Sequence, residues 1–147
     1  MKETIKKILI ALTLILSIQG VGNSQTGFGA GITYLNELGV QARYGIAFDN
    51  FNFIPKFTYY IVDDVTSLSL ELDAAYDLVT IGDDIPVYVF GGPAIYRSSA
   101  NGFTNTDLAV TIGAGTVISR FYGEFKYGNL FCDNCDGQMG FAVGYMF

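Results

Sequence analysis

The last eight residues of the chain, GFAVGYMF at positions 140–147, alternate between two kinds of side chain. Large apolar residues occupy every second position: Phe141, Val143, Tyr145 and Phe147. Positions 140, 142 and 144, on the other parity, are Gly or Ala. Because a β-strand directs alternate side chains to opposite faces, this segment has one apolar face and one face almost without side chains. Such a strand requires apolar surroundings on one side or a cramped space on the other.

The same alternation extends back through the chain. Between turn signals it predicts eight strands of about ten residues, near 26–34, 39–48, 51–61, 67–79, 86–97, 106–118, 121–131 and 138–147. In the fourth segment, leucines at 68, 70 and 72 alternate with polar residues at 67, 69, 71 and 73. An amphipathic helix would not produce this order, so the pattern predicts an all-β fold.

Turn signals and breakers add two predictions about the strands. Residues 91–93, Gly-Gly-Pro, interrupt the fifth segment and predict a β-bulge there, which leaves the phase of that strand open. Tight connections are predicted at 49–50, 82–84 and 119–120, and longer ones near Asn36, Asp63, Asn101 and Cys132. Alternating short and long connections are typical of an up-and-down barrel whose two rims face different compartments.

The first 24 residues have the organisation of a secretory signal peptide. Three lysines precede an apolar run at residues 8–18, and small residues lie ahead of a cleavage site near Ser24 and Gln25. The run is shorter than the about 20 residues of a transmembrane helix, so an uncleaved anchor is the weaker alternative. We therefore expect a signal peptide at 1–24 and a single barrel domain at 25–147.

Charge and composition exclude several classes of function. Without residues 1–24 the chain has five Lys and Arg against 13 Asp and Glu, a formal net charge of −8. Nucleic-acid binding needs clustered cations, so no nucleic-acid partner is expected. The chain contains no His, which excludes Ser-His-Asp and Cys-His nucleophile systems.

Alternation alone fits two kinds of eight-stranded barrel. A soluble carrier of the lipocalin type places its apolar face inside around a small apolar ligand, whereas a membrane barrel places that face outside. Small residues on the polar face, such as Gly27, Gly29 and Gly31, suit a narrow lumen. Aromatic residues near the strand ends of the apolar face suit an interfacial girdle. Both features favour the membrane barrel.

The signal peptide, the eight strands and the terminal Phe147 together resemble the small outer-membrane β-barrels of the OmpA/OmpX type. The resemblance covers the whole of 25–147 and implies an eight-stranded antiparallel up-and-down transmembrane β-barrel in a Gram-negative outer membrane. In that family the barrel-insertion machinery reads a C-terminal aromatic preceded by alternating apolar residues, and the matching positions are Phe141, Val143, Tyr145 and Phe147. The absence of Trp departs from the usual girdle.

The resemblance also implies a role. We expect a porin-like or OmpX-like but non-enzymatic monomer that acts in envelope structure or surface interaction, with outer-membrane lipid and the insertion machinery as partners. The partner of its loops is not indicated. A secreted carrier and a His-independent lipid-modifying barrel remain the alternatives.

Charged residues lie on the polar face of the strands and form the main candidate site. A carboxylate cluster of this kind is typical of acid-base or metal chemistry, but cations share the same face. Because buried charges must pair to offset desolvation, we expect an ion-pair network that plugs the lumen rather than a catalytic or metal site. Its predicted members are Arg43, Lys56, Glu71, Asp73, Asp77, Glu124 and Lys126.

The loop FCDNCDG at 131–137 contains the two cysteines of the chain, Cys132 and Cys135. No second Cys pair and no His is present to complete four zinc ligands, and Asp133 and Asp136 only partly match a calcium loop. In an oxidising compartment the favoured interpretation is a disulfide, with a thiol function or a metal as the alternatives. No cofactor is expected.

The C-terminal pattern generates a first test. Replacing Phe147 with Ser is expected to lower the amount of assembled barrel in the outer membrane far more than total synthesis, because the substitution removes the terminal aromatic of the insertion pattern. Heat-dependent gel mobility of the membrane fraction measures assembly, and a Phe131→Ser variant controls for the loss of an aromatic elsewhere. Unchanged assembly of the Phe147 variant would rule out this role.

Overall fold

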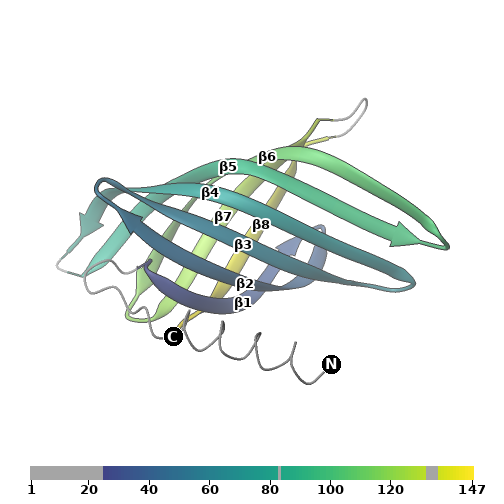
Figure 1. The fold of residues 1–147 in the computed structure, drawn as a ribbon. Coiled ribbons are helices and arrows are strands. Elements are labelled where there is room, and N and C mark those ends of the chain that lie inside the picture. The colour runs from purple at the N-terminus through teal and green to yellow at the C-terminus, as the bar shows by residue number, and fades with distance from the viewer. Residues whose placement is uncertain (1–24, 83, 132–135) are drawn as a thin grey trace, which may run out of the picture.

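The computed structural model describes residues 25–82, 84–131 and 136–147. The predicted signal peptide at 1–24 and the two cysteines therefore lie outside the described residues. The described chain forms eight strands in the order β1 to β8 (Figure 1). Their bounds are Gly27–Leu35, Glu37–Phe48, Phe51–Val62, Val65–Ile81, Ile85–Ala100, Phe103–Ile118, Phe121–Leu130 and Gln138–Met146.

Each strand pairs antiparallel with its neighbour in the chain, and β1 pairs with β8 to close the barrel. This arrangement confirms the predicted fold class, an eight-stranded antiparallel up-and-down barrel. Closure satisfies the ladder on both edges of every strand over most of the barrel, which is the condition for strands in a membrane. Among the described residues, no helix has the length and apolar character needed to cross a membrane.

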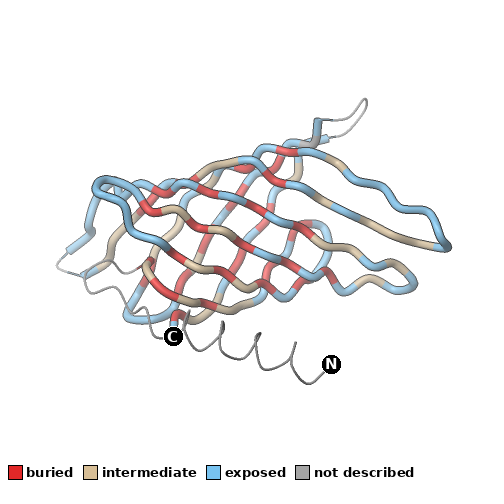
Figure 2. The backbone as a smooth tube through the Cα atoms, viewed as in Figure 1, coloured by how far each residue is buried: buried red, intermediate tan, exposed pale blue. Residues whose placement is uncertain are grey.

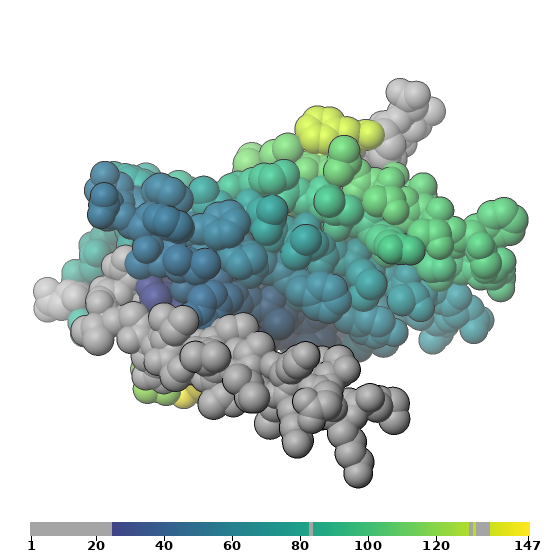
Figure 3. All heavy atoms as spheres, viewed as in Figure 1, coloured from purple at the N-terminus to yellow at the C-terminus, as the bar shows by residue number. Residues whose placement is uncertain are grey.

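The connections differ from the prediction at three of the four places where longer ones were expected. The turns at Asn36, at 63–64 and at 101–102 have only one or two residues. At 63–64 and 101–102 the reason is that β4, β5 and β6 extend to 16 or 17 residues and take up positions that were expected in loops. Asn36, Asp64 and Asn101 adopt positive φ, which lets the chain reverse tightly. The extended β3–β4 and β5–β6 hairpins project from one end of the molecule, in teal and green (Figures 1 and 3).

The β-bulge also lies elsewhere than predicted. The register of β5 with β6 runs without a shift through residues 91–93, so the expected bulge at Gly91–Gly92–Pro93 is wrong. The shift occurs in β4 between Asp77 and Val79, opposite Val87 and Tyr88. The extra residue brings Leu78 and Val79 both to the exposed side.

The barrel is polar inside and apolar outside. Buried and exposed residues alternate along the strands (Figure 2). The exposed positions carry large apolar side chains, such as Ile32, Phe57 and Leu70, whereas the buried positions include Arg43, Lys56 and Glu71. A carrier of an apolar ligand needs the opposite arrangement. The structure therefore contradicts the lipocalin-like alternative.

Glycines on the lumen side make room for rings and long side chains. A Cβ placed on Gly115 would lie 2.7 Å from Cζ of Tyr88 and 2.8 Å from Cγ of Glu124. At Gly144 it would meet the ring of Tyr122. A crowded interior thus explains the small residues of β6 and β8. It also explains why Gly and Ala alternate with large apolar residues at the C-terminus, because the lumen side of β8 has no room for larger side chains.

Two glycines provide a matched test of this crowding. Gly115→Ala is expected to destabilise the barrel by about 1–3 kcal/mol, since the added methyl group overlaps the Tyr88 ring and the Glu124 side chain. Gly123, on the neighbouring β7, has nothing within 4 Å of an added Cβ, so Gly123→Ala is the control and is expected to be neutral or stabilising. Urea unfolding in lipid vesicles measures both, and equal effects would contradict the crowding.

Candidate functional site

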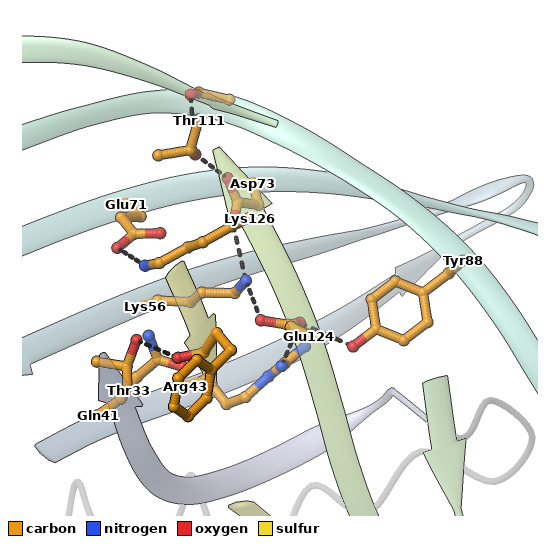
Figure 4. A network of polar contacts seen from close by, with 12 residues as sticks. Thr33, Gln41, Arg43, Lys56, Glu71, Asp73, Tyr88, Thr111, Glu124 and Lys126 are labelled. Atoms are coloured by element: carbon orange, nitrogen blue, oxygen red, sulfur yellow. Dashed lines mark hydrogen bonds and ion pairs between the residues drawn. The ribbon is translucent and has the colours of Figure 1, made fainter. Parts of the chain in front are cut away.

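The centre of the lumen holds a cluster of charged side chains around Glu124 of β7 (Figure 4). Nη1 of Arg43 donates to Glu124 Oε1 at 2.5 Å, and the hydroxyl of Tyr88 donates to the same oxygen at 2.7 Å. Nζ of Lys56 donates to Oε2 at 2.7 Å. One carboxylate therefore accepts hydrogen bonds from three different strands, β2, β3 and β5.

The position of Glu124 resolves a conflict between like charges. Arg43 and Lys56 are direct cross-strand partners in the β2–β3 ladder, an arrangement that is destabilising for two cations. Because Glu124 offers one oxygen to each, both cations find an acceptor from the opposite side of the lumen. The cluster thus connects strands far apart in the chain, since Arg43 and Glu124 are 81 positions apart in the sequence.

The network extends from Lys56 to β4 and β6. Lys56 Nζ also lies 2.9 Å from Oδ2 of Asp73, and the other oxygen of Asp73 accepts a hydrogen bond of 3.0 Å from the hydroxyl of Thr111. A separate pair joins β7 to β4, where Nζ of Lys126 donates to Glu71 Oε1 at 2.6 Å. These three cations and three carboxylates balance in formal charge, and their side chains are 0–1 % exposed.

Aromatic rings complete the surroundings of the cations. The guanidinium of Arg43 lies over the Tyr122 ring, 4.5 Å from its centroid, and Lys56 Nζ lies 3.9 Å from the centroid of Phe90. Among the described residues, Nε and Nη2 of Arg43 have no hydrogen-bond acceptor, so the Tyr122 ring face is the favourable neighbour of that part of the group. Rings and pairs together replace the water that the charges lose on burial.

The structure brings six of the seven predicted network residues into the lumen, and the seventh requires a correction. Asp77 is exposed, and its Oδ1 accepts a hydrogen bond of 2.7 Å from Nε2 of Gln25 rather than contacting a cation. Asp77 lies at the β-bulge near the turn end of β4, where the barrel opens to solvent. Water can solvate a carboxylate at this position, so no ion pair is needed.

Sequence reasoning missed the uncharged members of the cluster. Tyr88 and Phe90 belong to β5, whose phase was left open, and Thr111 and Tyr122 were read only as parts of their strands. The parity of β5 was the available signal. Because the register continues without a shift through Pro93, alternate residues of β5 stay on the same face. Tyr88 and Phe90 therefore face the lumen, as Ala94 does.

The residues of the predicted insertion pattern lie on the outside of β8. Phe141, Val143 and Phe147 are about half exposed. The Tyr145 ring meets Phe121 and Phe147 edge to face, with centroids 5.2 and 5.4 Å apart. The backbone N–H of Phe147 donates to Phe28 O at 2.8 Å. The terminal residue is thus part of an aromatic group at the end of the barrel that holds the C-terminus.

The chemistry open to the cluster is limited by its pairing. Glu71, Asp73 and Glu124 each contact a cation and have no exposed side-chain surface. Within 25–82, 84–131 and 136–147, no three His, Cys, Asp or Glu side chains are grouped so that they could hold a metal ion. The arrangement is that of a structural ion-pair network.

Removing one cation tests the energetic role of the network. Lys56→Met is expected to destabilise the barrel by about 3–5 kcal/mol, because it leaves Asp73 and Glu124 each with a lost partner in a buried site. Lys126→Met strands one carboxylate and is expected to cost less. Urea unfolding in lipid vesicles gives both values.

The control is Arg120→Met, which removes an exposed cation in the β6–β7 turn and is expected to change stability little. If Lys56→Met and Lys126→Met cost no more than the Arg120 control, the lumen charges are solvated and the network is not a structural element.

Comparison with known proteins gives matches to solved structures alone. No protein-family model matches the chain, and no curated protein does. The N-terminal β-barrel domain of Pseudomonas aeruginosa OprF is similar with a TM-score of 0.58 and 21% identity, over 82% of this chain and 95% of that one. Neisserial surface protein A gives a TM-score of 0.49 at 16% identity (82% and 93% covered). The attachment invasion locus protein Ail of Yersinia pestis gives 0.37 at 15% (82% and 93%). At these identities the likeness concerns the fold, and the chain has the eight-stranded barrel fold of the OprF domain.

Proposed function

We propose that this protein is a non-enzymatic integral outer-membrane β-barrel whose lumen is closed by its charged cluster and which acts in envelope structure or surface interaction. The observation that carries the proposal is the reversed polarity of the barrel. Large apolar side chains cover the outside, while Arg43, Lys56 and Lys126 are buried inside with their partners.

The outer surface supports a lipid environment. Exposed apolar side chains occur on every strand, which far exceeds the scattered apolar residues of a soluble surface. The rings of Phe48 and Phe51 stack beside the β2–β3 turn, and the aromatic group around Phe147 lies at the same end of the barrel (Figure 1). Aromatic rings at one level suit the membrane interface, with Tyr and Phe in place of Trp.

A closed lumen is supported by burial and by the tightness of the packing. The charged groups of four strands, β2, β3, β4 and β7, meet across the barrel, and Tyr88, Phe90 and Tyr122 fill the space beside them. In an eight-stranded barrel the interior is just wide enough for side chains to fill it. Ions would have to break several buried pairs to pass.

The same geometry disfavours the lipid-modifying alternative. An enzyme acting on lipid needs a reactive group at the lipid surface or at a mouth of the barrel. The carboxylates of the lumen cluster are paired inside the barrel and reach neither of these places. This arrangement supports a non-enzymatic role.

Conductance across planar bilayers tests the closed lumen. The purified wild-type barrel is expected to give no steady ion-conducting steps, because Lys56 and Arg43 remain paired with Glu124. Control bilayers contain detergent without protein, and tryptic protection confirms insertion. Steady openings of correctly folded wild-type protein would disprove the closed lumen and favour a pore.

A further inference from the structure

One cation lies on the outside of the barrel, apart from the other charges of the strands. Tyr88, Phe90 and Ala94 of β5 face the lumen, so Arg97 has the outer parity, and it is exposed. Arg97 is thus a single cation on an outer face that is otherwise uncharged along the eight described strands. All the other charged residues of these strands have the lumen parity: Glu37, Arg43, Lys56, Glu71, Asp73, Asp77, Asp107, Glu124 and Lys126.

Arg97 lies where β5 would leave the hydrocarbon region of the membrane. The segment 85–95 has about the length with which a tilted strand crosses that region, roughly 9–11 residues. An arginine is unfavourable in the middle of the region and nearly neutral at its boundary. Arg97, two positions after Ile95, is therefore at the membrane interface, at the end of the barrel opposite the C-terminus. The outer positions of 85–95 are all apolar: Ile85, Val87, Val89, Gly91, Pro93 and Ile95.

The surroundings of Arg97 on the outer face contain hydroxyl groups but no carboxylate. Its cross-strand neighbours are Leu68 of β4 and Thr106 of β6. Further along the same face, the hydroxyls of Ser99 and Thr104 lie 3.2 Å apart and share a hydrogen bond. Within 25–82, 84–131 and 136–147, no ion pair involves Arg97. The guanidinium is therefore available to an anion from outside the protein.

An apolar groove of about 310 Å³ lies next to Arg97, on the side toward the middle of the membrane. Pro93 and Ala109 belong to its lining and leave it hollow, because they are smaller than the leucines and isoleucines around them. Ile95, two positions before Arg97 on the same face, forms part of the wall. Phe131 closes the side toward β7, where its backbone N–H donates to β6. The cation and the groove are thus adjacent parts of one surface.

We infer that a membrane lipid with an anionic phosphate headgroup binds here, with its phosphate at Arg97 and one acyl chain in the groove. A guanidinium donates two parallel, charge-assisted hydrogen bonds to phosphate oxygens. The hydroxyl of the neighbouring Thr106 can donate another. A free phosphate ion would leave the apolar groove empty, and a neutral lipid would leave Arg97 without an anion. One molecule with an anionic head and an apolar tail uses both.

The inference rests on the proposed function, because it requires the outer face of the barrel to lie in lipid. Flotation with lipid vesicles and heat-dependent gel mobility test the membrane barrel separately. If the folded protein does not float with vesicles, the proposed function fails and the lipid site fails with it. If the protein floats but shows no preference for an anionic lipid, the lipid site alone fails.

Titration of the full-length protein in a neutral detergent, read out by native mass spectrometry, tests the lipid site. The probes are phosphatidylglycerol and phosphatidylcholine with identical acyl chains, and inorganic phosphate. Phosphatidylglycerol is anionic, whereas the choline group neutralises the phosphate of phosphatidylcholine. We expect one saturable phosphatidylglycerol per barrel, bound about fivefold more tightly than phosphatidylcholine. Inorganic phosphate at the same concentration is expected not to displace it, because it lacks the acyl chain.

Variants of the cation provide the first control. Arg97→Gln is expected to lower the affinity for phosphatidylglycerol to that for phosphatidylcholine. Arg120→Gln removes an exposed cation in the β6–β7 turn at the other end of the barrel and is expected to bind like the wild type. Heat-dependent gel mobility confirms that each variant is folded, and Arg97→Leu replaces Arg97→Gln if the latter does not assemble.

Variants of the groove provide the second control. Val110 lines the groove and is the cross-strand partner of Pro93, so Val110→Phe fills the groove and is expected to weaken the binding of both lipids. Val40→Phe enlarges an exposed valine on β2, outside the groove, and is expected to have no effect. The inference is overturned if the wild type binds both lipids equally, if inorganic phosphate displaces phosphatidylglycerol, or if the folded Arg97 and Val110 variants bind like their controls.

Discussion

The shared carboxylate of Glu124 is the interaction on which the rest of the barrel depends. Arg43 and Lys56 are neighbours across one ladder; without Glu124, Arg43 would lose its carboxylate partner and Lys56 would keep Asp73 alone. Burying a charge without a partner costs several kcal/mol, which is comparable to the whole stability of a small domain. Glu124 meets both cations and the Tyr88 hydroxyl from β7, so the correct register of β2, β3, β5 and β7 is needed at once. A one-residue slip of any of these strands would move its polar group to the apolar outer face.

Other features of the barrel follow from the space that this cluster needs inside it. Eight strands enclose little space, so charged side chains and rings fit only where facing positions lack a Cβ, as at Gly115 and Gly144. Because the polar side chains face the interior, the large apolar side chains are left on the outside of the barrel. The same closure separates the two ends. The end with the C-terminus carries aromatic rings around Phe147, and the outer face toward the opposite end carries Arg97 next to the apolar groove.

Much of this arrangement could be predicted from the sequence because alternation is a local property. Strict period two in segments such as 67–75 determines which side chains share a face, and this was sufficient for the strand count and six lumen charges. The up-and-down membrane barrel was predicted from the connections and from the family resemblance. Which cation pairs with which carboxylate was not predictable from the sequence. Arg43 and Glu124 meet across the lumen, and no spacing in the sequence indicates that contact. The side of Asp77 was predicted wrongly because the one-residue bulge in β4 has no strong sequence signature. Gly-Gly-Pro at 91–93 has the signature of a bulge, but β5 keeps its register with β6 through these residues. The short turns at Asn36 and Asn101 depend on positive φ, which composition alone does not reveal.

A double-mutant cycle on Arg43 and Glu124 tests the central claim most directly. Arg43→Met, Glu124→Gln and the double variant are unfolded by urea in lipid vesicles, and Arg120→Met with Glu124→Gln serves as the reference pair. If the buried pair organises the lumen, the Arg43–Glu124 coupling should exceed about 1.5 kcal/mol, while the reference pair should be additive within about 0.5 kcal/mol. Additivity of both pairs within that limit would contradict the account, because the lumen charges would then be independent and solvated.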